Sequence, residues 1–119
     1  MLKKLENRLF VPLTREAFEW FSLGKKWEIR KLNVGQYNLK NLHIGRDVEL
    51  RLGYQPGSSI WGKITEVEIY NSVDELINEI VFTNIIPTAK EENEAKQFIE
   101  KYVGRDNQII AFKVDKKER

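Results

Sequence analysis

The sequence GKKWEIR, residues 24–30, is the segment from which the fold and a candidate site are inferred most directly. Interpreted as a β-strand from Lys26 onward, it alternates strictly, because successive side chains of a strand point to opposite faces. Trp27 and Ile29 share one face and are natural core residues. The other face carries a charged row of Lys26, Glu28 and Arg30. That row either lies in solvent and forms cross-strand ion pairs, or lines a cleft and binds a polar ligand.

The composition indicates a single domain. A chain of 119 residues can build one hydrophobic core but not two. No apolar run approaches the roughly 20 residues that span a bilayer, and the first residues, MLKKLE, lack the apolar stretch of a signal peptide. We therefore expect one domain over residues 1–119, with its core at about 8–115, that is a monomer, sits in the cytoplasm and has no membrane partner.

The charge is distributed unevenly along the chain. Residues 1–63 hold 12 Lys or Arg against 6 Asp or Glu, whereas residues 64–119 hold 8 against 12, so a net +2 hides halves of +6 and −4. A basic half of this kind favours a polyanionic partner such as nucleic acid.

The N-terminal half predicts three strands and a helix. Residues 9–13 are apolar, with Pro12 near the strand's end or on a sheet edge. Thr14 is suited to cap a helix that Gly24 ends. After the charged strand, residues 47–52 alternate polar and apolar, as a half-buried strand does.

Irregular segments separate these strands from the next. Residues 33–45 contain two glycines and no clear period, and we expect Leu39, Leu42 and Ile44 to contact the core. Residues 53–59 are the strongest loop signal in the chain.

The C-terminal half predicts a long strand, two helices and a last strand. In residues 60–70 the apolar phase slips, which indicates a β-bulge near Thr65. Ser72 with Glu75, and Thr88 with Glu91, are two capping boxes.

We expect the second of these helices to end at Gly104 and to bury four residues, Ala95, Phe98, Ile99 and Tyr102. Residues 110–114 alternate as a strand, and residues 115–119 form a charged, frayed tail. This order of elements indicates an α+β domain around a small curled sheet.

Most kinds of catalytic or metal site are disfavoured. There is no cysteine, and His43 is the only histidine, so we expect neither a metal nor a cofactor. A P-loop, a GxGxxG motif and a nucleophile elbow are also absent. The charged strand remains, with Arg51, Tyr54 and Trp61 as residues able to share its cleft. Aromatic rings beside arginines suit unstacked bases of RNA.

These residues resemble the ASCH domain family, whose members share a PUA-like β-barrel. The family motif G-x-K-x-x-E-x-R is matched by Lys25, Glu28 and Arg30, although Gly24 directly precedes Lys25, so either Lys25 or Lys26 takes the role of the lysine. Residues 44–48 resemble the step into the family's next strand, and residues 61–67 resemble the strand after it. The resemblance implies a small PUA-like β-barrel with helices packed beside it.

The resemblance also implies two functions. In the first, a cleft binds RNA or a nucleotide-like ligand. Here Lys25, Lys26, Arg30 and Arg51 would contact phosphate or base edges, Glu28 would orient them, and Tyr54 and Trp61 would stack on bases.

The alternative is an amidohydrolase acting on an acylated nucleoside such as N4-acetylcytidine, as in one branch of the family. That branch uses a lysine, a threonine and a glutamate. Lys25 or Lys26 matches the lysine, Glu28 stands at the threonine's position, and Glu75 or Glu79 is a loose match for the distal acid.

Overall fold

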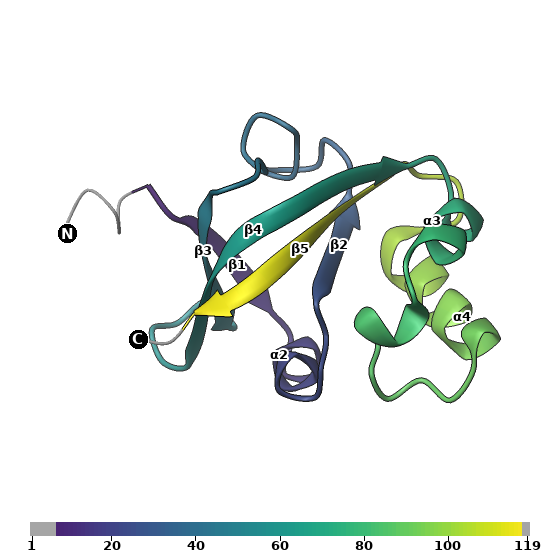
Figure 1. Cartoon of the computed structure of the whole chain (residues 1–119), viewed down its shortest axis with the longest axis horizontal. Helices are drawn as coiled ribbons and strands as arrows, with labels where there is room; N and C mark the ends of the chain where they lie inside the picture. Colours follow the sequence, from purple (N-terminus) through teal and green to yellow (C-terminus); the bar gives the residue numbers. More distant parts are fainter. Residues whose placement is uncertain (1–6, 118–119) are drawn as a thin grey trace.

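The computed structural model describes residues 7–117, and its elements follow the order predicted from the sequence (Figure 1). They are β1 (Leu9–Leu13), α2 (Arg15–Ser22), β2 (Trp27–Lys31), β3 (Asp47–Leu52), β4 (Ser59–Tyr70), α3 (Val73–Glu79), α4 (Glu92–Val103) and β5 (Ile109–Lys117), with a 3-10 turn η1 (Phe82–Asn84) before α4. The predicted α+β class, a small curled sheet with helices packed beside it, is confirmed.

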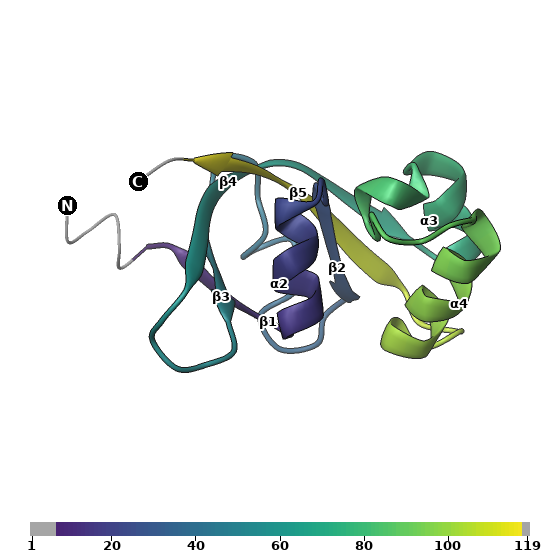
Figure 2. The same ribbon diagram turned by 90° about the horizontal axis from the view of Figure 1, so that it is seen from below.

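The strands form one curled sheet, a half-barrel, in the order β1-β3-β4-β5-β2. β1 pairs with β3 in parallel, and the other neighbours are antiparallel. β1 and β2 are therefore the two edges, and Pro12 lies on an edge strand as predicted. The Arg30 guanidinium joins the edges, since its Nη2 donates to the Pro12 carbonyl at 3.0 Å. Figure 2 shows α2 lying across the open side of the sheet, between β1 and β2.

The long β4–β5 ribbon contains the predicted bulge. Its register shifts between Ile64 and Glu66, on either side of Thr65. Gly62 lets the two strands approach closely, because a Cβ on this residue would lie 2.6 Å from Val114 Cγ1 and 2.8 Å from the Asp115 carbonyl oxygen.

The expectation of a single hydrophobic core is wrong, since two cores share β5, whose alternating side chains face both sides of the sheet. Ile110 and Phe112 point into the half-barrel, where they pack with residues of β1, β3 and α2 such as Phe21. Ile109 and Ala111 point to the opposite face and pack against α3 and α4. Figure 1 shows these two helices together at one end of the β4–β5 ribbon. The alternation of β5 therefore ties the half-barrel to the helical end.

The expected start of α4 is wrong. The helix begins at Glu92 rather than after Thr88, and Glu91 is its N-cap. Ile85 and Ile86 are buried and hold the preceding segment in turns against the core, so helical geometry starts one turn later.

The expectation that residues 115–119 form a frayed tail is also wrong in part. Residues 115–117 continue β5 and pair with residues 61–63 of β4, because β4 is long enough to offer them ladder partners. Residues 118–119 lie outside the described residues.

The expected burial of the 33–45 segment holds only for Leu42. Leu39 and Ile44 are 58% and 69% exposed, because this segment turns over the surface and sends a single leucine inward. Across residues 7–117, no helix is both long and apolar enough to cross a membrane.

Candidate functional site

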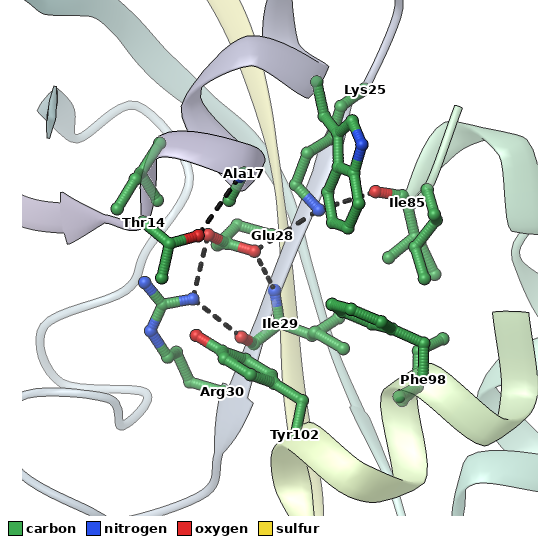
Figure 3. A pocket seen from close by; sticks show the side chains of 13 residues that line it. Thr14, Ala17, Lys25, Glu28, Ile29, Arg30, Ile85, Phe98 and Tyr102 are labelled. Carbon is green, nitrogen blue, oxygen red and sulfur yellow. Dashed lines mark hydrogen bonds and ion pairs between the residues drawn. The ribbon is translucent and has the colours of Figure 1, made fainter. Parts of the chain in front are cut away.

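A pocket lies where α2, β2 and α4 meet, beside Ile85 and Ile86 (Figure 3). The pocket is partly open to solvent. Its charged lining residues are Lys25, Glu28 and Arg30, and its aromatic ones are Trp20, Phe98 and Tyr102. Leu13, Thr14 and Ala17 complete the side formed by β1 and α2.

Local structure selects Lys25 over Lys26. The Thr14 side chain caps α2 by accepting from the Ala17 N–H, and Gly24 leaves the helix with φ 115°. The Lys25 N–H then donates to the Trp20 carbonyl at 2.9 Å, which keeps Lys25 beneath the helix, and the residue is 4% exposed. Lys26 is exposed. The strand alternation expected from Lys26 therefore begins one residue later, at Trp27.

Glu28 is the centre of the charged lining and is 3% exposed. Its Oε1 accepts from the Ile29 N–H at 3.1 Å and lies 3.4 Å from Lys25 Nζ. Its Oε2 lies 2.9 Å from Arg30 Nη1, yet no described residue donates a well-aligned hydrogen bond to it. Burial alone would raise the pKa of Glu28, but the charges of Arg30 and Lys25 outweigh it and hold this pKa below its usual range.

The Lys25 amine is enclosed by apolar and polar groups together. Its Nζ donates to the Ile85 carbonyl at 2.7 Å and lies 5.6 Å from the Trp20 ring centre. Burial lowers the pKa of Lys25, and the nearby Glu28 carboxylate offsets this only in part. Such an amine gives up its proton more readily than an ordinary lysine.

Arg30 contacts several groups in and around the pocket. Its guanidinium lies 5.0 Å from the Tyr37 ring centre and 5.7 Å from that of Tyr102, and Nη1 donates to the Ile29 carbonyl at 2.9 Å. Burial would lower the pKa of Arg30, but Glu28 more than compensates, so the guanidinium stays charged.

The other residues singled out from the sequence lie elsewhere. The pocket lining does not include Arg51, Tyr54 or Trp61, which lie on β3, on the loop after it and on β4. Arg51 bonds to Glu49, Trp61 pairs with Glu49 in register, and Tyr54 contacts Arg51. Glu75 and Glu79 are exposed on α3 and do not line the pocket.

Metal binding gains no support from the geometry. His43 is exposed, and residues 7–117 contain no cluster of three or more His, Cys, Asp or Glu suited to a metal ion.

Phe98 and Tyr102 form one side of the pocket, which we call the aromatic wall and which the sequence did not predict. Phe98 and Tyr102 were expected in the core, yet both are partly exposed and line the pocket. The buried stripe of α4 is Ala95, Ile99 and Val103, at a spacing of four residues. Phe98 and Tyr102 stand one residue before Ile99 and Val103, which is a signal that they flank the stripe rather than belong to it.

Comparison with solved structures identifies the fold. No protein-family model and no curated protein sequence matches the chain. The crystal structure of hypothetical protein PH0355 superposes with a TM-score of 0.70 at 15% identity, over 92% of this chain and 99% of that one. The solution structure of protein PF0455 from Pyrococcus furiosus gives 0.59 at 19% identity, over 94% and 99%.

A variant of the ASCH protein from Zymomonas mobilis superposes with a TM-score of 0.61 at 13% identity, covering 92% of this chain and 68% of that one. The chain has the ASCH-type fold. In this fold the pocket lies beside the half-barrel, between the barrel's open edge and the helical end.

Proposed function

We propose that this ASCH-type domain binds RNA by holding one base in the pocket. The observation that carries the proposal is the convergence of Lys25, Glu28 and Arg30 on one recess with an aromatic wall. The edge of a nucleobase presents donors and acceptors side by side. Glu28 Oε2 has acceptor capacity to spare for a base N–H, and Lys25 and Arg30 are donors for its ring nitrogens and carbonyls.

The lining of the pocket supports a single unpaired base rather than a duplex, because the charged and aromatic side chains lie together in one recess. Unpaired bases are the usual targets of sequence-reading RNA proteins, and stacking on an aromatic ring contributes about 1–3 kcal/mol per base. Phe98 and Tyr102 are placed to supply that stacking.

Two neighbouring lysines provide a matched test. A fluorescein-labelled single-stranded RNA hexamer of mixed sequence is titrated by anisotropy at two salt concentrations. Lys25→Met should weaken binding about tenfold, because it removes a buried donor but leaves the Glu28–Arg30 pair intact. Lys26→Met, on an exposed side chain, should stay within about twofold. Equal affinities of both variants and wild type, together with no dependence on salt, would refute the proposal.

Amide hydrolysis of an acylated nucleoside is the second candidate, favoured by one observation. The Lys25 amine is buried, has a lowered pKa and lies 3.4 Å from Glu28 Oε1, which suits a general base or nucleophile. Against it, neither Glu75 nor Glu79 lines the pocket, so the distal acid of the hydrolytic ASCH branch has no counterpart on α3.

Incubation with N4-acetylcytidine decides between the two candidates. A hydrolase releases cytidine, detected by chromatography, and loses the release in Lys25→Met but keeps it in Lys26→Met. If the wild-type protein binds RNA but releases no cytidine, the hydrolase candidate is rejected and RNA binding is retained.

A further inference from the structure

A second cluster of aromatic and basic side chains lies on β1, β3 and the loop that follows β3. We call Phe10, Arg51 and Tyr54 the Tyr54 platform. The Arg51 guanidinium lies 4.5 Å from the Phe10 ring centre, and the Tyr54 ring meets Phe10 edge-on at 6.3 Å between centres. Tyr54 is 75% exposed, which is unusual for a tyrosine packed against another ring.

Hydrogen bonds hold Arg51 and the backbone of the loop that carries Tyr54. Arg51 donates from Nε to Glu49 Oε2 at 2.9 Å and from Nη1 to the Tyr54 carbonyl at 3.1 Å, so the arginine fixes the loop that carries the tyrosine. Glu49 is itself buried and also accepts from Ser59 Oγ at 2.7 Å. A loop whose backbone is already fixed loses less conformational entropy when a ligand stacks on its exposed aromatic ring.

The platform adjoins the pocket across β1. Pro12 accepts from Arg30 of the pocket through its carbonyl, and it pairs in register with Arg51 of the platform. The Gly53 N–H donates to the carbonyl of Leu13, a residue of the pocket lining, at 2.9 Å. Arg30 and Arg51 are therefore both neighbours of Pro12 on the edge strand β1.

We propose that the Tyr54 platform binds the nucleotide next to the base held in the pocket, with Tyr54 stacking on that second base and Arg51 facing the phosphate between the two. This inference rests on the proposed RNA-binding function and adds the class of ligand. The domain recognises a single-stranded segment of at least two nucleotides, not a free nucleoside. Stacking is tolerant of base identity, so the pocket selects the base and the platform adds affinity.

The test separates the two subsites. Binding of a nucleoside monophosphate mixture and of a mixed-sequence RNA trinucleotide is measured by calorimetry for wild type, Tyr54→Ala, Tyr54→Phe and Gln55→Ala. Tyr54→Ala should weaken the trinucleotide about tenfold and leave the monophosphate unchanged, because the latter occupies the pocket alone. Tyr54→Phe keeps the ring and should bind as wild type does. Gln55→Ala, exposed in the same loop, is the matched control.

The outcomes that overturn the inference differ from those that overturn the proposed function. A trinucleotide affinity that Tyr54→Ala leaves unchanged, while Lys25→Met lowers it, removes the platform and retains the pocket. Equal weakening of monophosphate and trinucleotide by Tyr54→Ala also removes it, since the tyrosine would then act on the pocket. Failure of wild-type protein to bind either probe overturns both.

Discussion

Glu28 and Glu49 are two buried glutamates that face arginines, yet their surroundings differ. Glu49 accepts from Arg8 Nε at 2.7 Å, Arg51 Nε at 2.9 Å and Ser59 Oγ at 2.7 Å, so both of its oxygens are satisfied. Glu28 has Oε2 without a well-aligned donor among residues 7–117, and it faces the pocket. A buried carboxylate oxygen that is held by an ion pair without a well-aligned hydrogen bond can still accept from a ligand, whereas one with its hydrogen bonds made serves the fold.

The partners differ as well. The side chains of Lys25 and Arg30 are 2% and 12% exposed, whereas those of Arg51 and Arg8 are 16% and 27% exposed. Cations that lose their carboxylate near water can be rehydrated, and enclosed cations cannot.

The largest expected effect is therefore on stability. Glu28→Ala should lower the free energy of unfolding by about 3–5 kcal/mol, because it leaves two buried cations unpaired. Glu49→Ala should lower it by about 1–3 kcal/mol, the range for lost hydrogen bonds to a charged group. Urea unfolding monitored by tryptophan fluorescence measures both. Glu79→Ala, on an exposed helix position, should stay within about 0.5 kcal/mol. A larger loss for Glu49→Ala than for Glu28→Ala would contradict the comparison.

Lowering the pH should measurably reduce the stability that Glu49 contributes. Burial alone would raise the pKa of Glu49, but the hydrogen bonds from Arg51, Ser59 and Arg8 lower it from 4.5 to about 2. A folded-state pKa below the unfolded one contributes stability that is fully present above pH 4.5 and is lost as pH falls towards 2. Glu49→Gln should remove this part of the acid dependence, so its urea midpoint should fall less steeply than that of wild type between pH 5 and about 2.5. Parallel curves for the two proteins would show that Glu49 is not so stabilised.

The smallest expected effects come from removing the hydroxyl groups of Ser59 and Thr14, and these two changes separate stability from ligand contact. Ser59→Ala removes one donor to Glu49, and Thr14→Ala removes the N-cap of α2, each at a cost of about 1 kcal/mol in the free energy of unfolding. Only Thr14 lines the pocket, so only Thr14→Ala should also lower affinity for the RNA hexamer. An equal loss of affinity in both variants would mean that stability, rather than contact, sets binding.

The sequence predicted the regular elements well, because their signals are local. Thr14 and Ser72 cap helices as expected, and the bulge at Thr65 follows from a slip in apolar phase that any reader of the strand can see. The start of α4 was missed because the burial of Ile85 and Ile86 overrides a local capping signal at Thr88.

The site was less predictable, since it depends on contacts between distant segments. The choice between Lys25 and Lys26 is made by the Trp20 and Asn84 carbonyls, which accept from the two backbone N–H groups. The aromatic wall requires α4 to lie beside β2, a neighbour far away in the sequence. A local sequence pattern carries no information about contacts between segments that lie so far apart in the chain.

The shared strand β5 has a mechanical consequence. Ile110 and Phe112 are anchored in one core while Ile109 and Ala111 are anchored in the other, so neither half can rotate against the other without pulling these side chains out of their packing. A ligand that enters the pocket, between the half-barrel and the helical end, meets two sides that are already at their final separation. It therefore spends no binding energy on closing them. The protein should accordingly melt in one transition rather than two.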